Sequence, residues 1–258
     1  MFEKGYGYRR KEAVRKSKEV MRTKGDSAWL MRESPLLRTP DKPVDSYDFQ
    51  FRPVLPDGAG NLKEYIEDTL ATKYGDAVLL ELGGTGTLLA RGFSDGFFKK
   101  SAGVSLSDFR DDIDPRLKLS DKELNHRVIE GDILTKETQE SVRSWLGEDK
   151  KVDVMIERMA GGHDFLPNEP FYMAPKANTW YELLDEGGIL FAEVPDAFLD
   201  YMTDWEQYLS QNYGSVIDLQ VADSECGIDV RLQKLSGAPE QLPLLPAKDV
   251  MEQARRLL

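Results

Sequence analysis

The chain has 258 residues, of which 40% are hydrophobic and 10% aromatic, a composition that is typical of a folded globular protein and excludes a disordered one. Its formal net charge of −12 disfavours binding to nucleic acids, because like charges repel. With a single cysteine, Cys226, and two histidines, His126 and His163, we expect neither an internal disulfide nor a bound metal.

No apolar run reaches the length of about 18 residues that a membrane span needs, and the first thirty residues lack the apolar core of a signal peptide. We therefore expect no contact with membranes and a cytoplasmic location. Residues 1–25 carry nine Lys or Arg and three Glu, a local charge of +6. This basic arm is expected to be helical over residues 11–23. It either docks on the acidic remainder of the chain, or binds a partner or gates the substrate site.

The next segment, residues 34–57, contains five prolines, which predicts an extended connector. Asn61 can cap a helix that continues to about residue 73. We accordingly divide the chain into an N-terminal arm and connector (1–60), an α/β domain (61–240) and a C-terminal tail or helix (241–258).

Beyond residue 76, short apolar runs alternate with helical patterns, which indicates β-α-β units and a parallel sheet. Two further runs, separated by a short polar turn instead of a helix, predict an antiparallel hairpin. The expected fold is α/β, with a mostly parallel seven-stranded sheet and an N-terminal helical arm. The expected strands are 77–82, 102–106, 127–130, 152–156, 189–194, 215–222 and 227–235, and the expected helices are 87–99, 136–146, 171–184 and 197–211.

The segment VLLELGGTGT runs from a buried strand that ends in Glu81 into a glycine-rich turn before a helix. Glycines let a ligand approach the backbone, N–H groups at a helix start bind carboxylate or phosphate, and Glu81 can accept a hydrogen bond from an ammonium or a hydroxyl. The segment resembles motif I of the class I S-adenosylmethionine-dependent methyltransferases, and the resemblance extends over residues 62–235. It implies a Rossmann-like three-layer sandwich that binds S-adenosylmethionine through Glu81, Gly83, Gly84, Thr85 and Gly86.

The resemblance also implies positions for the rest of the cofactor. In this family an acidic residue at the end of the second strand binds both ribose hydroxyls. Ser105, followed by Leu106, stands at that position, and Asp108 is the alternative. VIEGDIL resembles the third family motif, in which Asp132 would bond the adenine amino group while the backbone N–H of Ile133 reads the ring.

The fourth strand ends in Glu157 and Arg158, at the place where the family has the floor between cofactor and acceptor. We name Glu157 and His163 as candidate catalytic residues, because a carboxylate or an imidazole there can take a proton from an acceptor oxygen or nitrogen. A plain loop role for His163 is the alternative. Aromatic candidates for lining an acceptor pocket are Trp29, Tyr47, Phe165, Phe171, Tyr172 and Trp180.

Methyl transfer from a sulfonium is a direct displacement that depends on alignment and needs few catalytic side chains, which suits a chain poor in His and Cys. The expected activity is O- or N-methylation of a small molecule, and a homo-oligomer is left open. One alternative is a protein or RNA acceptor steered by the basic arm. Another is an NAD(P)-dependent reductase, since Tyr172 and Lys176 have the spacing of the dehydrogenase Tyr-Lys pair, although their order in the chain disfavours it. A non-catalytic relative is the third.

Overall fold

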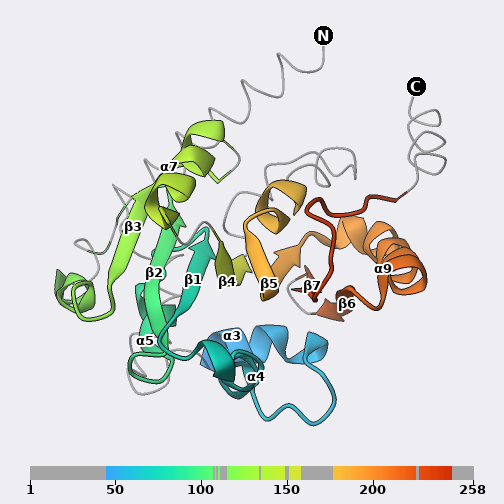
Figure 1. Cartoon of the computed structure of the whole chain (residues 1–258), viewed down its shortest axis with the longest axis horizontal. Coiled ribbons are helices and arrows are strands. Elements are labelled where there is room, and N and C mark those ends of the chain that lie inside the picture. The colour runs from blue at the N-terminus through green and yellow to red at the C-terminus, as the bar shows by residue number, and fades with distance from the viewer. Residues whose placement is uncertain are drawn as a thin grey trace.

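The computed structural model describes residues 45–106, 108, 110, 115–133, 135–148, 151–157, 177–224 and 227–245. Within them the chain forms one seven-stranded sheet with the strand order β3-β2-β1-β4-β5-β7-β6 (Figure 1). The strands are β1 (Ala77–Leu82), β2 (Phe98–Ser105), β3 (His126–Glu130), β4 (Val152–Glu157), β5 (Leu184–Val194), β6 (Ile217–Ser224) and β7 (Gly227–Lys234).

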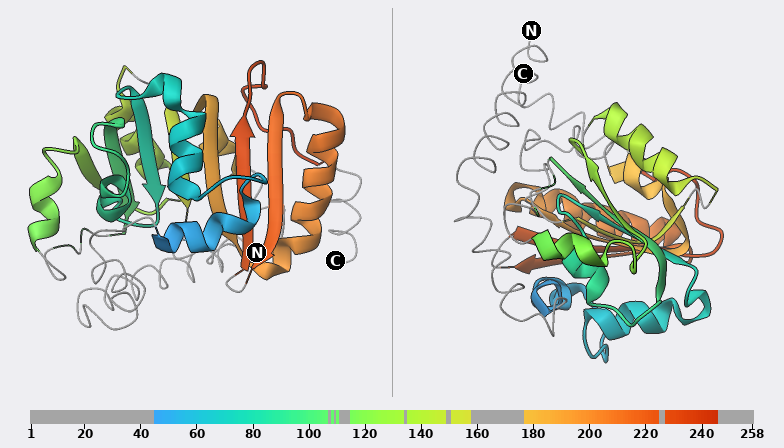
Figure 2. Two further views of the ribbon diagram at one scale, coloured as in Figure 1. Left: turned by 90° about the horizontal axis from the view of Figure 1, so that it is seen from below. Right: turned by 90° about the vertical axis from the view of Figure 1, so that its left-hand side faces the viewer.

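Strands β1 to β5 pair in parallel, whereas β7 runs antiparallel to both of its neighbours, β5 and β6. Helices cover both faces of the sheet, which makes three layers (Figure 2). This confirms the predicted α/β fold with its C-terminal hairpin. One face carries α3 (Asp45–Phe51), α4 (Leu62–Thr69) and α5 (Thr87–Arg91), and the other carries α7 (Lys136–Leu146), α9 (Leu199–Tyr213) and a helical turn at 177–181.

The two central strands, β1 and β4, are buried along their whole length. Asp153 on β4 is a charged residue at 5% exposure, and its carboxylate accepts hydrogen bonds from Val78 N at 2.8 Å and from Lys73 Nζ at 2.5 Å. Lys73 also reaches Asp185 at 2.8 Å. Because a buried carboxylate is costly unless it is paired and hydrogen-bonded, these contacts fix β1, β4 and the start of β5 relative to one another.

Two predicted helices have the expected limits or caps. Helix α7 begins and ends at the predicted residues, with Thr135 as its N-cap accepting from Thr138 N. Helix α4 is capped by Asn61, whose Oδ1 accepts from Glu64 N at 2.9 Å. After Thr69 the helical segment tightens into a short 3-10 turn, Ala71–Lys73.

The helix predicted over 87–99 is wrong beyond Arg91. Gly92 caps α5, Gly96 adopts a left-handed φ of +71°, and strand β2 already begins at Phe98. The two glycines lower helix propensity, and the buried rings of Phe93 and Phe97 pack against each other and against Phe98 instead of following a helical stripe.

The fifth strand, predicted over 189–194, starts earlier in the structure. Strand β5 begins at Leu184 and includes Gly187 and Gly188. Gly187 has a φ of +81°, and the register against β4 shifts nearby, between Val152 and Val154. The glycines therefore allow the backbone to adopt an irregular conformation inside the strand. Of the helix predicted over 171–184, only 177–181 is helical in the described residues.

The connector predicted to be extended is helical over residues 45–54. Helix α3 leads directly into a 3-10 turn, Arg52–Val54, and Pro53 is tolerated there because the first turn of a helix needs no N–H donor. Tyr47 and Phe51 are buried against the sheet. The basic arm, including its predicted helix over 11–23, and residues 246–258 lie outside the described residues.

Candidate cofactor site

The carboxyl ends of β1, β2 and β4 meet at one edge of the sheet. Leu82 of β1 is paired with Val104 of β2 and with Glu157 of β4, while Ser105 is paired with Glu130 of β3. In open α/β sheets, ligands bind at this edge. The register places Glu81, Ser105 and Glu157 at this edge. The other predicted cofactor residues follow β1, β2 or β3 in the chain within a few positions, namely Gly83, Gly84, Thr85, Gly86, Leu106, Asp132 and Ile133.

The glycine loop folds tightly over Glu81. Gly83 and Gly86 have φ angles of +90° and +71°, which favour glycine. At Gly84 a Cβ atom would lie 2.6 Å from the carboxyl carbon of Glu81, so a side chain there would displace this carboxylate. Helix α5 has five residues, which is short for a helix dipole. An anion at this site would therefore be recognised mainly by the N–H groups of the loop. This differs from the prediction that N–H groups at the helix start bind it.

Two residues beneath the loop were missed by the sequence argument. A Cβ on Gly103 of β2 would overlap the carbonyl group of Thr85 and lie 2.5 Å from the backbone nitrogen of Gly86. His126, at the start of β3, has its Nε2 2.7 Å from the Thr85 carbonyl oxygen. A glycine inside an otherwise apolar strand is a recognised signal of close backbone approach, and it could have identified Gly103.

Glu81 is also held from the side of α3. The hydroxyl of Tyr47 donates to Glu81 Oε1 at 2.6 Å, and both side chains are 2% exposed. Tyr47, which the sequence suggested for an acceptor pocket, therefore contacts the carboxylate under the glycine loop. The segment before the α/β domain thus helps to fix the orientation of Glu81.

At the end of β2, the Asp108 carboxylate forms a two-point pair with Arg110, with both N···O distances at 2.9 Å. The hydrogen bonds from Arg110 lower the pKa of Asp108. Arg110 is 3% exposed and also donates to Thr87 Oγ1 at 2.8 Å and to Asp121 at 2.6 Å. Since Asp108 is bound within this network, we favour Ser105 over Asp108 as the residue facing a ribose.

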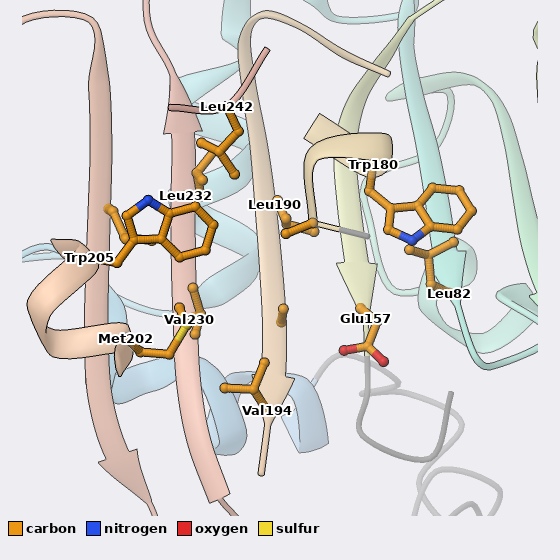
Figure 3. Close-up of a pocket in the computed structure, with 13 residues that line it drawn as sticks. Leu82, Glu157, Trp180, Leu190, Val194, Met202, Trp205, Val230, Leu232 and Leu242 are labelled. Atoms are coloured by element: carbon orange, nitrogen blue, oxygen red, sulfur yellow. The ribbon is translucent and has the colours of Figure 1, made fainter. Parts of the chain in front are cut away.

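Glu157, at the end of β4, is 1% exposed and faces an apolar cavity of about 50 Å³ between the sheet, the 177–181 turn and α9. Figure 3 shows its carboxylate at the strand end and the indole of Trp180 beside Leu82. The indole N–H of Trp180 has no hydrogen-bond partner among the residues that the structure describes. Other lining residues include Leu190, Met202 and Trp205.

Several candidates cannot be placed. His163, the other candidate catalytic residue, lies outside the described residues, as do Arg158 and four of the suggested pocket aromatics, Trp29, Phe165, Phe171 and Tyr172. In the described part of the chain, no group of three or more His, Cys, Asp or Glu side chains is arranged to hold a metal ion. No helix in that part is both long and apolar enough for a membrane span.

The strand order, the antiparallel β7 and the glycine loop after β1 give the chain the fold of class I S-adenosylmethionine-dependent methyltransferases. No protein-family model and no curated protein matches it. Similar solved structures include an rRNA methylase from Streptococcus thermophilus, with 16% identity over 66% of this chain and 94% of that chain and a TM-score of 0.43.

Two further solved structures are similar to the chain. A precorrin-6y methyltransferase from Geobacter metallireducens has 13% identity, covers 70% of this chain and 93% of its own, and gives a TM-score of 0.40. A ribosomal protein methylase from Lactobacillus delbrueckii has 11% identity, covers 67% and 77%, and gives a TM-score of 0.39.

Proposed function

We propose that this protein is an S-adenosylmethionine-dependent methyltransferase that methylates an oxygen or nitrogen atom of a small molecule. The observation that carries the proposal is the loop Gly83–Gly86, which closes over the buried carboxylate of Glu81 at the carboxyl end of the central strand. A carboxylate and adjacent backbone N–H groups are complementary to the ammonium and the carboxylate of the methionine part of the cofactor.

A small-molecule acceptor is supported by an apolar cavity beside the strand ends in the part of the chain that the structure describes. Leu82 and Glu157, which are register partners on β1 and β4, both line it, so the cavity reaches the carboxyl ends of these two strands. Apart from Glu157 its lining is hydrophobic and aromatic. Such a space suits a compact apolar group of an acceptor.

In this proposal the chain contributes alignment and one proton acceptor. S-adenosylmethionine supplies the electrophilic methyl group when it is bound. The apolar walls orient the acceptor and exclude water, and Glu157 takes the proton from its hydroxyl or amine. Alignment alone provides several kcal/mol of barrier reduction in displacement reactions, on the order of 7 kcal/mol at best geometry.

A labelled-methyl assay tests the acceptor class. The full chain is incubated with methyl-labelled S-adenosylmethionine and, in parallel, with a panel of phenols and amines, total RNA, or protein extract. We expect label in the small molecules, and a roughly 100-fold slower transfer for Glu157→Gln, the lower range for loss of a general base. Trp180→Phe, which keeps an aromatic ring in the cavity wall and removes the indole N–H together with the second ring, is the comparison variant and should slow transfer much less.

The same assay can reject this acceptor class. Label appearing only in RNA or protein, and lost on removal of residues 1–25, would assign the acceptor to the alternative in which the basic arm steers a polymer.

A further inference from the structure

His126 occupies a fixed position directly under the glycine loop. Its backbone N–H donates to the Asp121 carbonyl at 2.7 Å, and the preceding Asn125 takes a left-handed φ of 45° that turns the chain into β3. The ring is buried, with its Nε2 2.7 Å from the Thr85 oxygen and its Nδ1 2.8 Å from Ser101 Oγ. A Cβ on Gly86 would lie 3.0 Å from the ring carbon Cε1.

These two contacts fix the tautomer of the ring. The carbonyl oxygen of Thr85 can only accept a hydrogen bond, so Nε2 carries the proton and donates it. Nδ1 is then the acceptor, and the Ser101 hydroxyl donates to it. Burial lowers the pKa of His126 and favours this neutral form. Through these two hydrogen bonds, the imidazole of His126 links the backbone of the loop to β2 and β3.

The direction of the Thr85 carbonyl matters for the ligand side of the loop. In a trans peptide the C=O and the following N–H point in opposite directions. A Thr85 carbonyl held toward His126 and Gly103 consequently turns the N–H of Gly86 in the opposite direction, away from them. If the peptide rotated, a carbonyl oxygen would face an incoming carboxylate and repel it.

We propose that His126 is a positioning residue for the cofactor loop, which it holds in its ligand-binding conformation through the hydrogen bond from Nε2 to the Thr85 carbonyl. The identity of the ligand rests on the proposed function, whereas the effect on the loop does not. Among the described residues, the charged side chains that act on the ring are Asp121, Arg110 and Asp108.

A pair of amide variants separates the two hydrogen bonds of the ring. In His126→Gln the amide nitrogen reaches about as far as Nε2 and can still donate to Thr85. In His126→Asn the amide stops near the position of Nδ1 and can reach Ser101 but not Thr85. Both are polar and of similar volume, so a general loss of packing would affect the two alike.

Two measurements are made on both variants. The first is hydrogen exchange of the Gly84–Thr87 amides in the free protein, which needs no ligand. We expect protection close to that of the wild type for His126→Gln and at least fivefold faster exchange for His126→Asn, with similar melting temperatures. The second is calorimetric binding of S-adenosylhomocysteine, where His126→Asn should raise Kd about fivefold to tenfold, the effect of losing roughly one hydrogen bond.

Equal loop exchange in the Gln and Asn variants would overturn the proposal. Faster exchange in His126→Asn without any binding of S-adenosylhomocysteine by the wild type would uphold the role in the loop and reject the proposed function.

Discussion

Replacement of Gly103 by alanine is expected to raise the Kd for S-adenosylhomocysteine at least 100-fold. The added Cβ would overlap the carbonyl group of Thr85 and meet the nitrogen of Gly86. Both contacts are with backbone atoms, so the clash can be relieved only if the loop changes its conformation over Glu81. Overpacking of this kind costs on the order of 1–3 kcal/mol of stability and shifts the backbone. Calorimetric titration, with the melting temperature measured in parallel, checks both effects.

Gly60→Ala is the matched control for this variant. A Cβ at Gly60 would meet only the end of the Glu64 side chain, which can rotate away, so its affinity should equal that of the wild type. If Gly103→Ala bound the ligand with unchanged Kd, the close approach between β2 and the loop would have no role in binding, and the proposed site geometry would be wrong.

Asp229→Asn is expected to stabilise the protein at alkaline pH. Asp229 is fully buried near the start of β7 and is paired across the strands with Glu193, and neither of its carboxylate oxygens makes a hydrogen bond of normal geometry among the described residues. Burial raises the pKa of Asp229 to about 7; the nearby Ser224 hydroxyl opposes this effect, and the negative charge of Glu193 adds to it. The neutral carboxyl is therefore favoured in the folded state, whereas the unfolded chain ionises near its ordinary value.

The direction in which stability changes with pH follows from this difference in pKa between the folded and the unfolded state. The contribution of protonated Asp229 to stability is complete below an unfolded pKa of about 4 and is lost as the pH rises toward 7. At pH 8.5 the ionised, buried carboxylate should cost up to about 4 kcal/mol, at 1.36 kcal/mol per pKa unit. Asp229→Asn should recover about 1–4 kcal/mol at pH 8.5 and close to nothing at pH 4.

Denaturant unfolding at both pH values measures this effect. Asp223→Asn provides the control, because Asp223 lies on the neighbouring strand β6 and is exposed, so its replacement should leave the free energy of unfolding unchanged at either pH. A destabilised Asp229→Asn at pH 8.5 would show that the carboxylate is ionised at little cost and serves another purpose in the fold.

The sheet could be predicted because its strands depend on local pattern. The buried run at 77–82 appears in the sequence as it does in the structure, and both hairpin strands were found, although β6 continues to Ser224, two residues beyond its predicted end. Helix α7 was equally predictable, since its Thr135 cap and its apolar stripe lie within one segment. The glycine loop was found for the same reason, because its three glycines follow Glu81 closely in the sequence.

What the sequence did not show depends on contacts between distant segments. His126 and Thr85 are 41 positions apart, and no local pattern links an imidazole to that carbonyl. Likewise, the helix at 45–51 exists because Tyr47 and Phe51 gain burial against the sheet, although the prolines around it suggested an extended chain. Tertiary packing overrode propensity in that segment.

The central claim is that the loop over Glu81 binds an adenosyl sulfonium cofactor. The most direct test is calorimetric titration of the full chain with S-adenosylmethionine and S-adenosylhomocysteine, with NADPH as the control ligand and Glu81→Gln as the site variant. Our account predicts binding with a Kd on the order of micromolar, weakened at least tenfold in Glu81→Gln, which keeps the shape and removes the charge that meets the ammonium. Binding of NADPH in place of both adenosyl ligands, or no binding by the folded chain, would contradict it.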